Sequence, residues 1–166
     1  MLSLGCVVVD ETGKELGNWY ANFDLLEGST QDPDTMDFWK KNQKYYDLTR
    51  QWTQSPAEAM THFAEWVNSF NCSPVAVAMP SGFDFTWVWW YLKRFVGHSP
   101  FSFSCIDMKT MAMCILKSEY RQSTKKYWPK HWFNRDLKHT HQAEDDAREQ
   151  AASFIAMLKD LRNESS

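Results

Sequence analysis

Residues 139–158, HTHQAEDDAREQAASFIAML, constrain the fold of this chain most, because they join an amphipathic helix to a histidine and several acids. Apolar side chains recur there at three- and four-residue steps, which is typical of one buried helix face. These are Ala143, Ala147, Ala151, Phe154, Ile155, Leu158 and Leu161. The polar residues allow two interpretations. In the first, Glu144, Asp145 and Asp146 are helix-start acids that the helix dipole favours, and His141 lies in a solvated loop. In the second, the histidine and the acids belong to a functional site.

Length and composition indicate a single domain over residues 1–162 and a short tail over residues 163–166. A chain of 166 residues can bury a core without disulfides or metal staples. With a net charge of −3, any binding of nucleic acid must depend on a local basic patch. No signal-peptide pattern and no apolar run of membrane-spanning length is present, so we expect a cytoplasmic protein without membrane contact. The four separated cysteines indicate reduced core thiols: Cys6, Cys72, Cys105 and Cys114.

Apolar patterns and turn residues predict an α/β architecture that begins with a strand hairpin. Residues 10–14, DETGK, form its turn, in which Gly13 takes a positive φ. Ser55 and Glu58 form a capping box at the start of the third helix. The predicted strands cover residues 2–9, 16–23, 74–79 and 101–106, and the predicted helices cover residues 33–41, 45–52, 56–70, 83–96, 108–117 and 143–161. We expect the strand over residues 74–79 to be fully buried and the helix over residues 83–96 to be buried on most of its circumference.

Asp84 is the one acid in the predicted helix over residues 83–96. It follows a predicted buried strand and lies in the first turn of the next helix, where open α/β sheets hold their active sites. A plain helix-start acid is an equally good interpretation of the same position.

Residues 118–138 form a long connection without a clear period, which is typical of a functional segment. Basic and aromatic side chains alternate in it, and this combination suits phosphate contact and base stacking. The candidates are Lys125, Lys126, Trp128, Lys130, Trp132 and Arg135, with Arg121, Tyr127, Phe133 and Lys138 beside them. The alternative is a loop that folds its aromatic side chains onto the domain.

Three segments resemble the second and third motifs of the DEDDh 3′-5′ exonucleases, which have a ribonuclease H-like fold. They are PSGFDF at residues 80–85, SCID at 104–107 and HTHQAEDDAREQA at 139–151. The third motif of that family is a histidine, four residues and an aspartate, which selects His141 and Asp146 and leaves Asp145 as a neighbour. Residues 23–42 also resemble a bacterial and phage exoribonuclease subgroup. The resemblance implies a central mixed β-sheet flanked by helices, with the first strand missing from the sequence given.

The resemblance implies hydrolysis of phosphodiester bonds with two divalent ions, Mg²⁺ or Mn²⁺, about 4 Å apart. It gives Asp84 and Asp146 as metal ligands and catalytic residues and His141 as the general base. An imidazole suits that role because its ordinary pKa is about 6.5. In one regular helix, His141 and Asp146 would point about 140° apart. We therefore expect His141 in the loop before the helix.

The first motif of the family, Asp-x-Glu on an earlier strand, is absent from this sequence. Asp10 and Glu11 do not replace it, because adjacent residues of an extended chain point to opposite faces and these two fall in a predicted turn. With two metal carboxylates in place of four, we expect little or no exonuclease activity. Without the first strand we also expect unpaired strand edges and an exposed apolar groove.

The function that the resemblance implies is a 3′-5′ exoribonuclease acting on the 3′ end of single-stranded RNA or DNA, with RNA inherited from the subgroup. Phe83 and Phe85, which flank Asp84, are further candidates for nucleic-acid contact. One alternative is a noncatalytic module that binds nucleic acid or a partner on the same fold. Another is a purely structural helical protein. The surplus of aromatic residues could also serve a homodimer, with the candidates Trp39, Trp52, Trp89 and Trp90.

Overall fold

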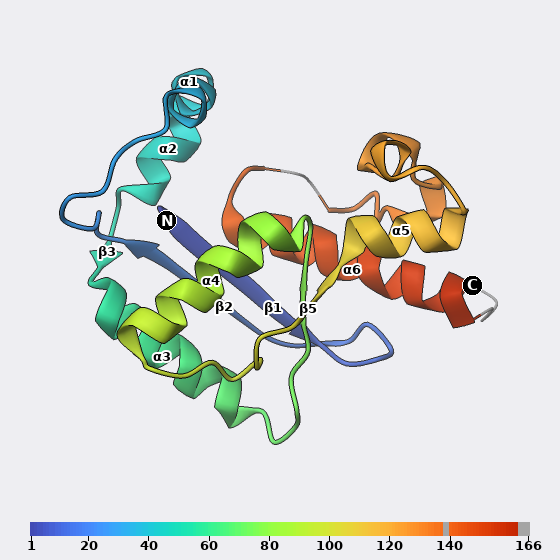
Figure 1. The fold of residues 1–166 in the computed structure, drawn as a ribbon, viewed down its shortest axis with the longest axis horizontal. Coiled ribbons are helices and arrows are strands. Elements are labelled where there is room, and N and C mark those ends of the chain that lie inside the picture. Colours follow the sequence, from blue (N-terminus) through green and yellow to red (C-terminus); the bar gives the residue numbers. More distant parts are fainter. Residues whose placement is uncertain (138–139, 163–166) are drawn as a thin grey trace.

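The computed structural model describes residues 1–137 and 140–162, which form a mixed α/β fold (Figure 1). The elements in order are β1 (Ser3–Val9), β2 (Glu15–Phe23), α1 (Pro33–Lys41), α2 (Gln43–Thr49), β3 (Thr53–Gln54), α3 (Pro56–Ser69), β4 (Ala76–Ala78), α4 (Ser81–Phe95), β5 (Cys105–Asp107), α5 (Met108–Leu116), three short 3-10 helices η1 (Tyr120–Gln122), η2 (Lys125–Tyr127) and η3 (Lys130–Trp132), and α6 (Ala143–Arg162). Lys138, His139 and the predicted tail lie outside the described residues. Within those ranges, no helix is both long and apolar enough to cross a membrane.

β1 and β2 form the predicted antiparallel hairpin, with Leu4 opposite Ala21. In the turn, the Asp10 carboxylate accepts the backbone N–H groups of Thr12 at 2.9 Å and Lys14 at 3.0 Å. These hydrogen bonds hold the pKa of Asp10 below its usual range, the side-chain bond from Thr12 contributing most. Asp10 is therefore a turn residue, as predicted.

The helices α1 and α3 each begin with a proline, but their N-caps differ. The Asp32 carboxylate accepts the backbone N–H of Thr35 at 2.8 Å, as an N-cap side chain does. Ser55 occupies the same place before α3 without a side-chain hydrogen bond, and its backbone carbonyl accepts the N–H of Ala59. The helix is confirmed, but the predicted capping box is wrong. The helix predicted over residues 45–52 is α2, which ends at Thr49.

The sheet is small and divided into two parts. The order β1-β2-β3 makes one part, and β4 pairs in parallel with β5 in the other, Ala76 lying opposite Cys105. The predicted mixed α/β fold is confirmed, and among residues 1–137 and 140–162 β1 and β4 are not hydrogen-bonded neighbours. The strands predicted over residues 74–79 and 101–106 are longer than the observed ones, which pair over three residues each, Ala76–Ala78 in β4 and Cys105–Asp107 in β5. Val75 is 67% exposed, so full burial of that segment is wrong.

One face of α4 packs on the core, and the other face of this helix is exposed to solvent. Val88, Tyr91 and Leu92 are its buried residues, and they pack with α3 and β2. Four large apolar side chains of the helix are exposed: Phe83, Trp87, Trp89 and Trp90. The prediction of burial around most of the helix is wrong, because neighbouring elements contact α4 along one side.

α6 packs between the strand hairpin and α5, as its position between β1 and α5 in Figure 1 shows. Ile155 of α6 packs closely against Gly13 of the hairpin turn. A Cβ atom added to Gly13 would lie 3.1 Å from the Ile155 side chain. Met157 is fully buried in a second cluster with Met108 and Trp132. Because α6 is contacted on two sides, its buried positions do not follow the single predicted stripe. Leu161, a predicted inward residue, is 55% exposed.

All four cysteines are free thiols. Cys6 is partly buried and packs against the first cluster, and burial raises its pKa to about 12. Cys72 and Cys114 are exposed. The prediction of core thiols is therefore wrong for these two, because they lie on the outer side of the segments that carry them.

Candidate active site

Asp84 lies in the first turn of α4, directly after β4, as predicted. Its backbone N–H donates to the carbonyl of Pro80 at 3.2 Å, which fixes it within the helix. Burial raises the pKa of Asp84 to about 6. A backbone hydrogen bond with Met79 acts against this rise, and the negative charge of Asp146 adds to it.

Asp146 lies in the first turn of α6, where its backbone N–H donates to the carbonyl of Gln142 at 3.0 Å. Its negative charge contributes to the raised pKa of Asp84, so the two carboxylates, from distant segments, lie within electrostatic range of each other. Each stands at a helix N-terminus, where the helix dipole favours negative charge. The structure thus brings together the two acids that the motifs select.

Asp107, between β5 and α5, ties the starts of two helices together. One of its carboxylate oxygens accepts the backbone N–H of Ser81 at 2.8 Å, and the other accepts the N–H of Thr110 at 2.7 Å and its hydroxyl at 2.8 Å. Burial would raise the pKa of Asp107, but these hydrogen bonds hold it below its usual range. The bond to Ser81 anchors the first residue of α4 and so supports Asp84. The sequence signal for this role was an Asp-x-x-Thr pattern at a helix start.

His141 lies in the turn before α6, outside the helix, as the geometry of the motif requires. Its φ of +62° is in the left-handed region. The imidazole meets two aromatic rings edge to face, with centroid distances of 5.3 Å to Phe38 of α1 and 5.9 Å to Tyr45 of α2. Sequence patterns do not reveal these two neighbours, because they come from a segment about 100 residues earlier in the chain.

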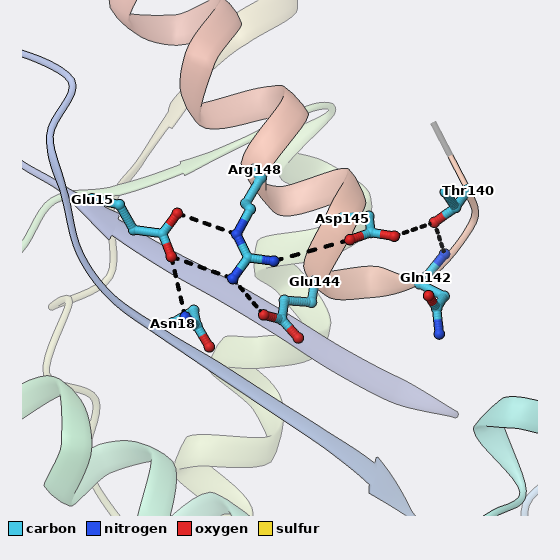
Figure 2. A network of polar contacts seen from close by, with 7 residues as sticks. All are labelled: Glu15, Asn18, Thr140, Gln142, Glu144, Asp145 and Arg148. Atoms are coloured by element: carbon cyan, nitrogen blue, oxygen red, sulfur yellow. Dashed lines mark hydrogen bonds and ion pairs between the residues drawn. The ribbon is translucent and has the colours of Figure 1, made fainter. Parts of the chain in front are cut away.

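Arg148 of α6 is the centre of a polar network beside this turn (Figure 2). Its guanidinium lies 3.1 Å from Glu15 of β2, 2.6 Å from Glu144 and 4.0 Å from Asp145. The hydrogen bond from Arg148 is the main reason why the pKa of Glu15 is below its usual range. On the far side of Asp145, its carboxylate accepts the hydroxyl of Thr140 at 2.7 Å.

Comparison with known proteins identifies the family of the chain. Residues 1–158 match the family model described as the 3′-5′ exoribonuclease Rv2179c-like domain. The chain belongs to this family.

A similar protein is the 3′-5′ DNA exonuclease Cap18 of Escherichia coli, which is 28% identical over 107 residues. The match covers 60% of this chain and 54% of Cap18, so the chain spans about half the length of this relative. Membership of a 3′-5′ exonuclease family agrees with the resemblance seen in the motifs around Asp84, His141 and Asp146.

The basic aromatic segment before α6 is organised differently from the prediction. Trp128 is 5% exposed and Trp132 is fully buried, and they pack against each other with ring centroids 5.6 Å apart. Their rings cannot present a face to a base, so the expectation of a stacking surface is wrong for both. The segment folds these side chains onto α5 and α6, because two large apolar rings gain more from burial than from exposure.

The charged residues of that segment divide into two groups. Lys125 forms an ion pair with Glu149 of α6 at 3.1 Å. Lys126, Lys130 and Arg135 are exposed.

The two phenylalanines that flank Asp84 differ in exposure. Phe83 is 63% exposed, whereas Phe85 is half-buried and its ring centroid lies 6.4 Å from that of Phe101. Phe83 is therefore open to solvent, whereas Phe85 is engaged in packing.

The site offers part of a metal centre. Hard divalent ions are bound by oxygen ligands, and Asp84 and Asp146 are of the right kind. Across residues 1–137 and 140–162, however, no group of three or more His, Cys, Asp and Glu side chains could hold a metal ion. The described residues do not by themselves complete the centre.

Proposed function

We propose that this chain is a 3′-5′ exonuclease domain that removes nucleotides from the 3′ end of single-stranded RNA, and more slowly from DNA. The observation that carries the proposal is that Asp84 and Asp146 each lie in the first turn of a helix and interact electrostatically, the negative charge of Asp146 adding to the rise in the pKa of Asp84. Carboxylates forced together in this way favour a bound cation, which relieves their repulsion. Family membership supports the exonuclease class.

The proposed cofactor is Mg²⁺ or Mn²⁺, which when bound supplies a Lewis acid for the phosphodiester. Asp84 and Asp146 would hold it. We propose that binding is weak and turnover slow in this chain, because two carboxylates are fewer ligands than such a centre needs. In this proposal His141 takes a proton from the attacking water, since its turn before α6 leaves the imidazole outside the helix.

Exposed aromatic and basic groups support the proposed single-stranded substrate. Phe83, beside Asp84, offers a ring for stacking. Lys126, Lys130 and Arg135 offer positive charge for phosphates. The preference for RNA rests on the family description, whereas Cap18 is named a DNA exonuclease.

The test uses one oligonucleotide sequence as single-stranded RNA and as DNA, labelled at the 5′ end and incubated with Mn²⁺, Mg²⁺ or EDTA. We expect a metal-dependent ladder that shortens from the 3′ end, faster for RNA. Asp84→Asn, Asp146→Asn and His141→Gln should each abolish it. The matched control is Asp24→Asn, at an exposed aspartate in the loop after β2, which should leave the ladder unchanged. Cleavage that survives in the first three variants would contradict the proposal.

A second candidate is a noncatalytic module that binds nucleic acid on the same fold. It is favoured by the incomplete metal centre among the described residues. Binding of the labelled RNA at normal affinity, with no ladder at any metal concentration, would select this candidate.

The proposed partner, besides the nucleic acid, is a second copy of the chain. The exposed aromatic face of α4, with Trp89 and Trp90, gives such a dimer an apolar surface. Light scattering of the wild-type chain and of the Trp90→Gln variant tests this, and a wild-type monomer at all concentrations would contradict it.

A further inference from the structure

The turn that carries His141 has a backbone conformation that a histidine does not adopt without support. Its φ of +62° is in the left-handed region, which only a few per cent of non-glycine residues adopt, asparagine, aspartate and histidine more often than the others. Such a conformation persists where the surrounding structure fixes it. The contacts of the neighbouring residues therefore decide where the imidazole points.

Thr140 precedes His141, and its side chain bonds to residues that follow His141. Its hydroxyl donates to the Asp145 carboxylate at 2.7 Å and accepts the backbone N–H of Gln142 at 3.3 Å. The residues immediately before and after His141 are thus held by one oxygen atom. Figure 2 shows this hydroxyl between Gln142 and Asp145.

Asp145 is fixed in its turn by the network around Arg148. The guanidinium lies 4.0 Å from the carboxylate oxygen that does not face Thr140. Arg148 itself is held by Glu15 of β2, whose other hydrogen-bond donor is Asn18 at 3.1 Å. The chain of contacts runs from the strand hairpin through Arg148 and Asp145 to the turn, so the sheet sets the position of the turn.

An ordinary helix-start acid would face solvent or accept a backbone N–H of its own helix. Asp145 instead accepts a side-chain hydroxyl from the segment before the helix. Its neighbour Asp146 instead contributes negative charge at Asp84, so the two adjacent aspartates have different surroundings.

We propose that Thr140 and Asp145 are positioning residues, which hold the His141 imidazole against Phe38 and Tyr45 and so place it for proton transfer. The catalytic part of this inference rests on the proposed function, whereas the placement of the ring does not. Neither residue needs to touch the substrate.

The first test observes the ring directly, by the imidazole C–H signals in ¹H–¹³C NMR spectra of the full chain without metal, with His141→Gln assigning the signal. The rings of Phe38 and Tyr45 should shift the wild-type His141 signals away from the positions of an unstructured histidine. Thr140→Ala and Asp145→Ala should each return the signals toward those positions. Thr140→Ser and Asp145→Asn, which keep the donor and an acceptor, should restore the shift.

The matched control is Thr61→Ala, which removes a threonine hydroxyl that donates to a backbone carbonyl at 2.8 Å on the exposed side of α3. It should leave the His141 signals in place. Unchanged signals in both alanine variants would overturn the proposal, as would equal changes in the control.

The second test measures nucleotide release with Mn²⁺. Thr140→Ala and Asp145→Ala should lower kcat about 10- to 100-fold and leave KM nearly unchanged. The His141 ring loses its orientation in these variants, whereas the surface that binds the substrate is unaltered. If the wild-type chain releases nothing, the proposed function fails while the NMR test still decides the placement of His141. If release is normal in Thr140→Ala, the catalytic part of the inference fails and the proposed function stands.

Discussion

Asp146 of α6 raises the pKa of Asp84 of α4, although 61 residues separate them in the chain. Burial is the larger cause, and together they bring the Asp84 pKa to about 6. A buried acid with a raised pKa lowers stability when it ionises. The site is therefore expected to cost stability in the absence of a cation.

Asp84→Asn should stabilise the metal-free protein at pH 7 to 8 by about 1–2 kcal/mol, a figure reduced for the partial exposure of the group. The folded pKa is above the unfolded value of about 3.9, so the wild type loses stability relative to the variant as the pH rises from about 4 to 6. Urea unfolding at several pH values measures this.

Asp24→Asn serves as the control for that measurement, because Asp24 is exposed. It should change the free energy of unfolding little at any pH. Wild type and Asp84→Asn with equal stability at pH 8 would contradict the burial of the Asp84 charge.

Asp160→Ala should destabilise the fold by about 1–3 kcal/mol, because it leaves the buried indole N–H of Trp132 without its acceptor. That N–H donates to Asp160 at 2.7 Å, and His131 lies 2.8 Å from the same oxygen. Thermal unfolding at pH 7 measures the loss. Asp24→Ala, at an exposed site, should show none, and a similar fall in both variants would refute the assignment.

The same carboxylate gives a pH dependence of the opposite sign to that of Asp84. Burial would raise the pKa of Asp160, but the hydrogen bonds from Trp132 and His131 bring it below its usual range. A lowered folded pKa gives stability that is present above the ordinary carboxyl pKa of about 3.9 and is lost as the pH falls below it. The difference in stability between wild type and Asp160→Ala should therefore shrink toward pH 3.

Gly5→Ala should disturb the packing of α6 on β1. A Cβ at Gly5 would overlap the backbone carbonyl of Ala143 and the backbone nitrogen of Glu144. Backbone atoms cannot yield as a flexible side chain does, so we expect a loss of about 1–3 kcal/mol or more in the free energy of unfolding.

Gly82→Ala is the matched control in urea unfolding, because a Cβ there has no heavy atom within 4 Å and the residue lies in α4. It should stabilise the protein by about 0.5–1 kcal/mol. A tolerated Gly5→Ala would mean that α6 lies farther from β1 than the structure shows.

Charge reversal at Lys126, Lys130 and Arg135 should weaken the binding of a labelled single-stranded oligonucleotide. Each phosphate contact that is lost should reduce the slope of log K against log salt by about 0.7. Fluorescence anisotropy at several salt concentrations measures both effects. Lys14→Glu, in the hairpin turn, is the control, and an equal loss of affinity there would show that net charge and not this surface is responsible.

The sequence alone determined much of the local structure, and its motifs selected Asp84 and Asp146 by resemblance to a family. A proline after Asp32 and glycine in a DETGK turn act through the backbone of a few residues, so α1 and the hairpin were predictable. The spacing from His141 to Asp146 required a turn before a helix, and α6 begins at Ala143.

Tertiary structure decided which faces are buried and what holds the site. Trp128 and Trp132 look like stacking residues in the sequence, but their burial depends on where α6 passes. The contacts of His141 with Phe38 and of Arg148 with Glu15 join segments more than 100 residues apart. Local patterns carry no information on such contacts, because burial and charge pairing depend on the packing of whole elements and not on the residues next in the chain.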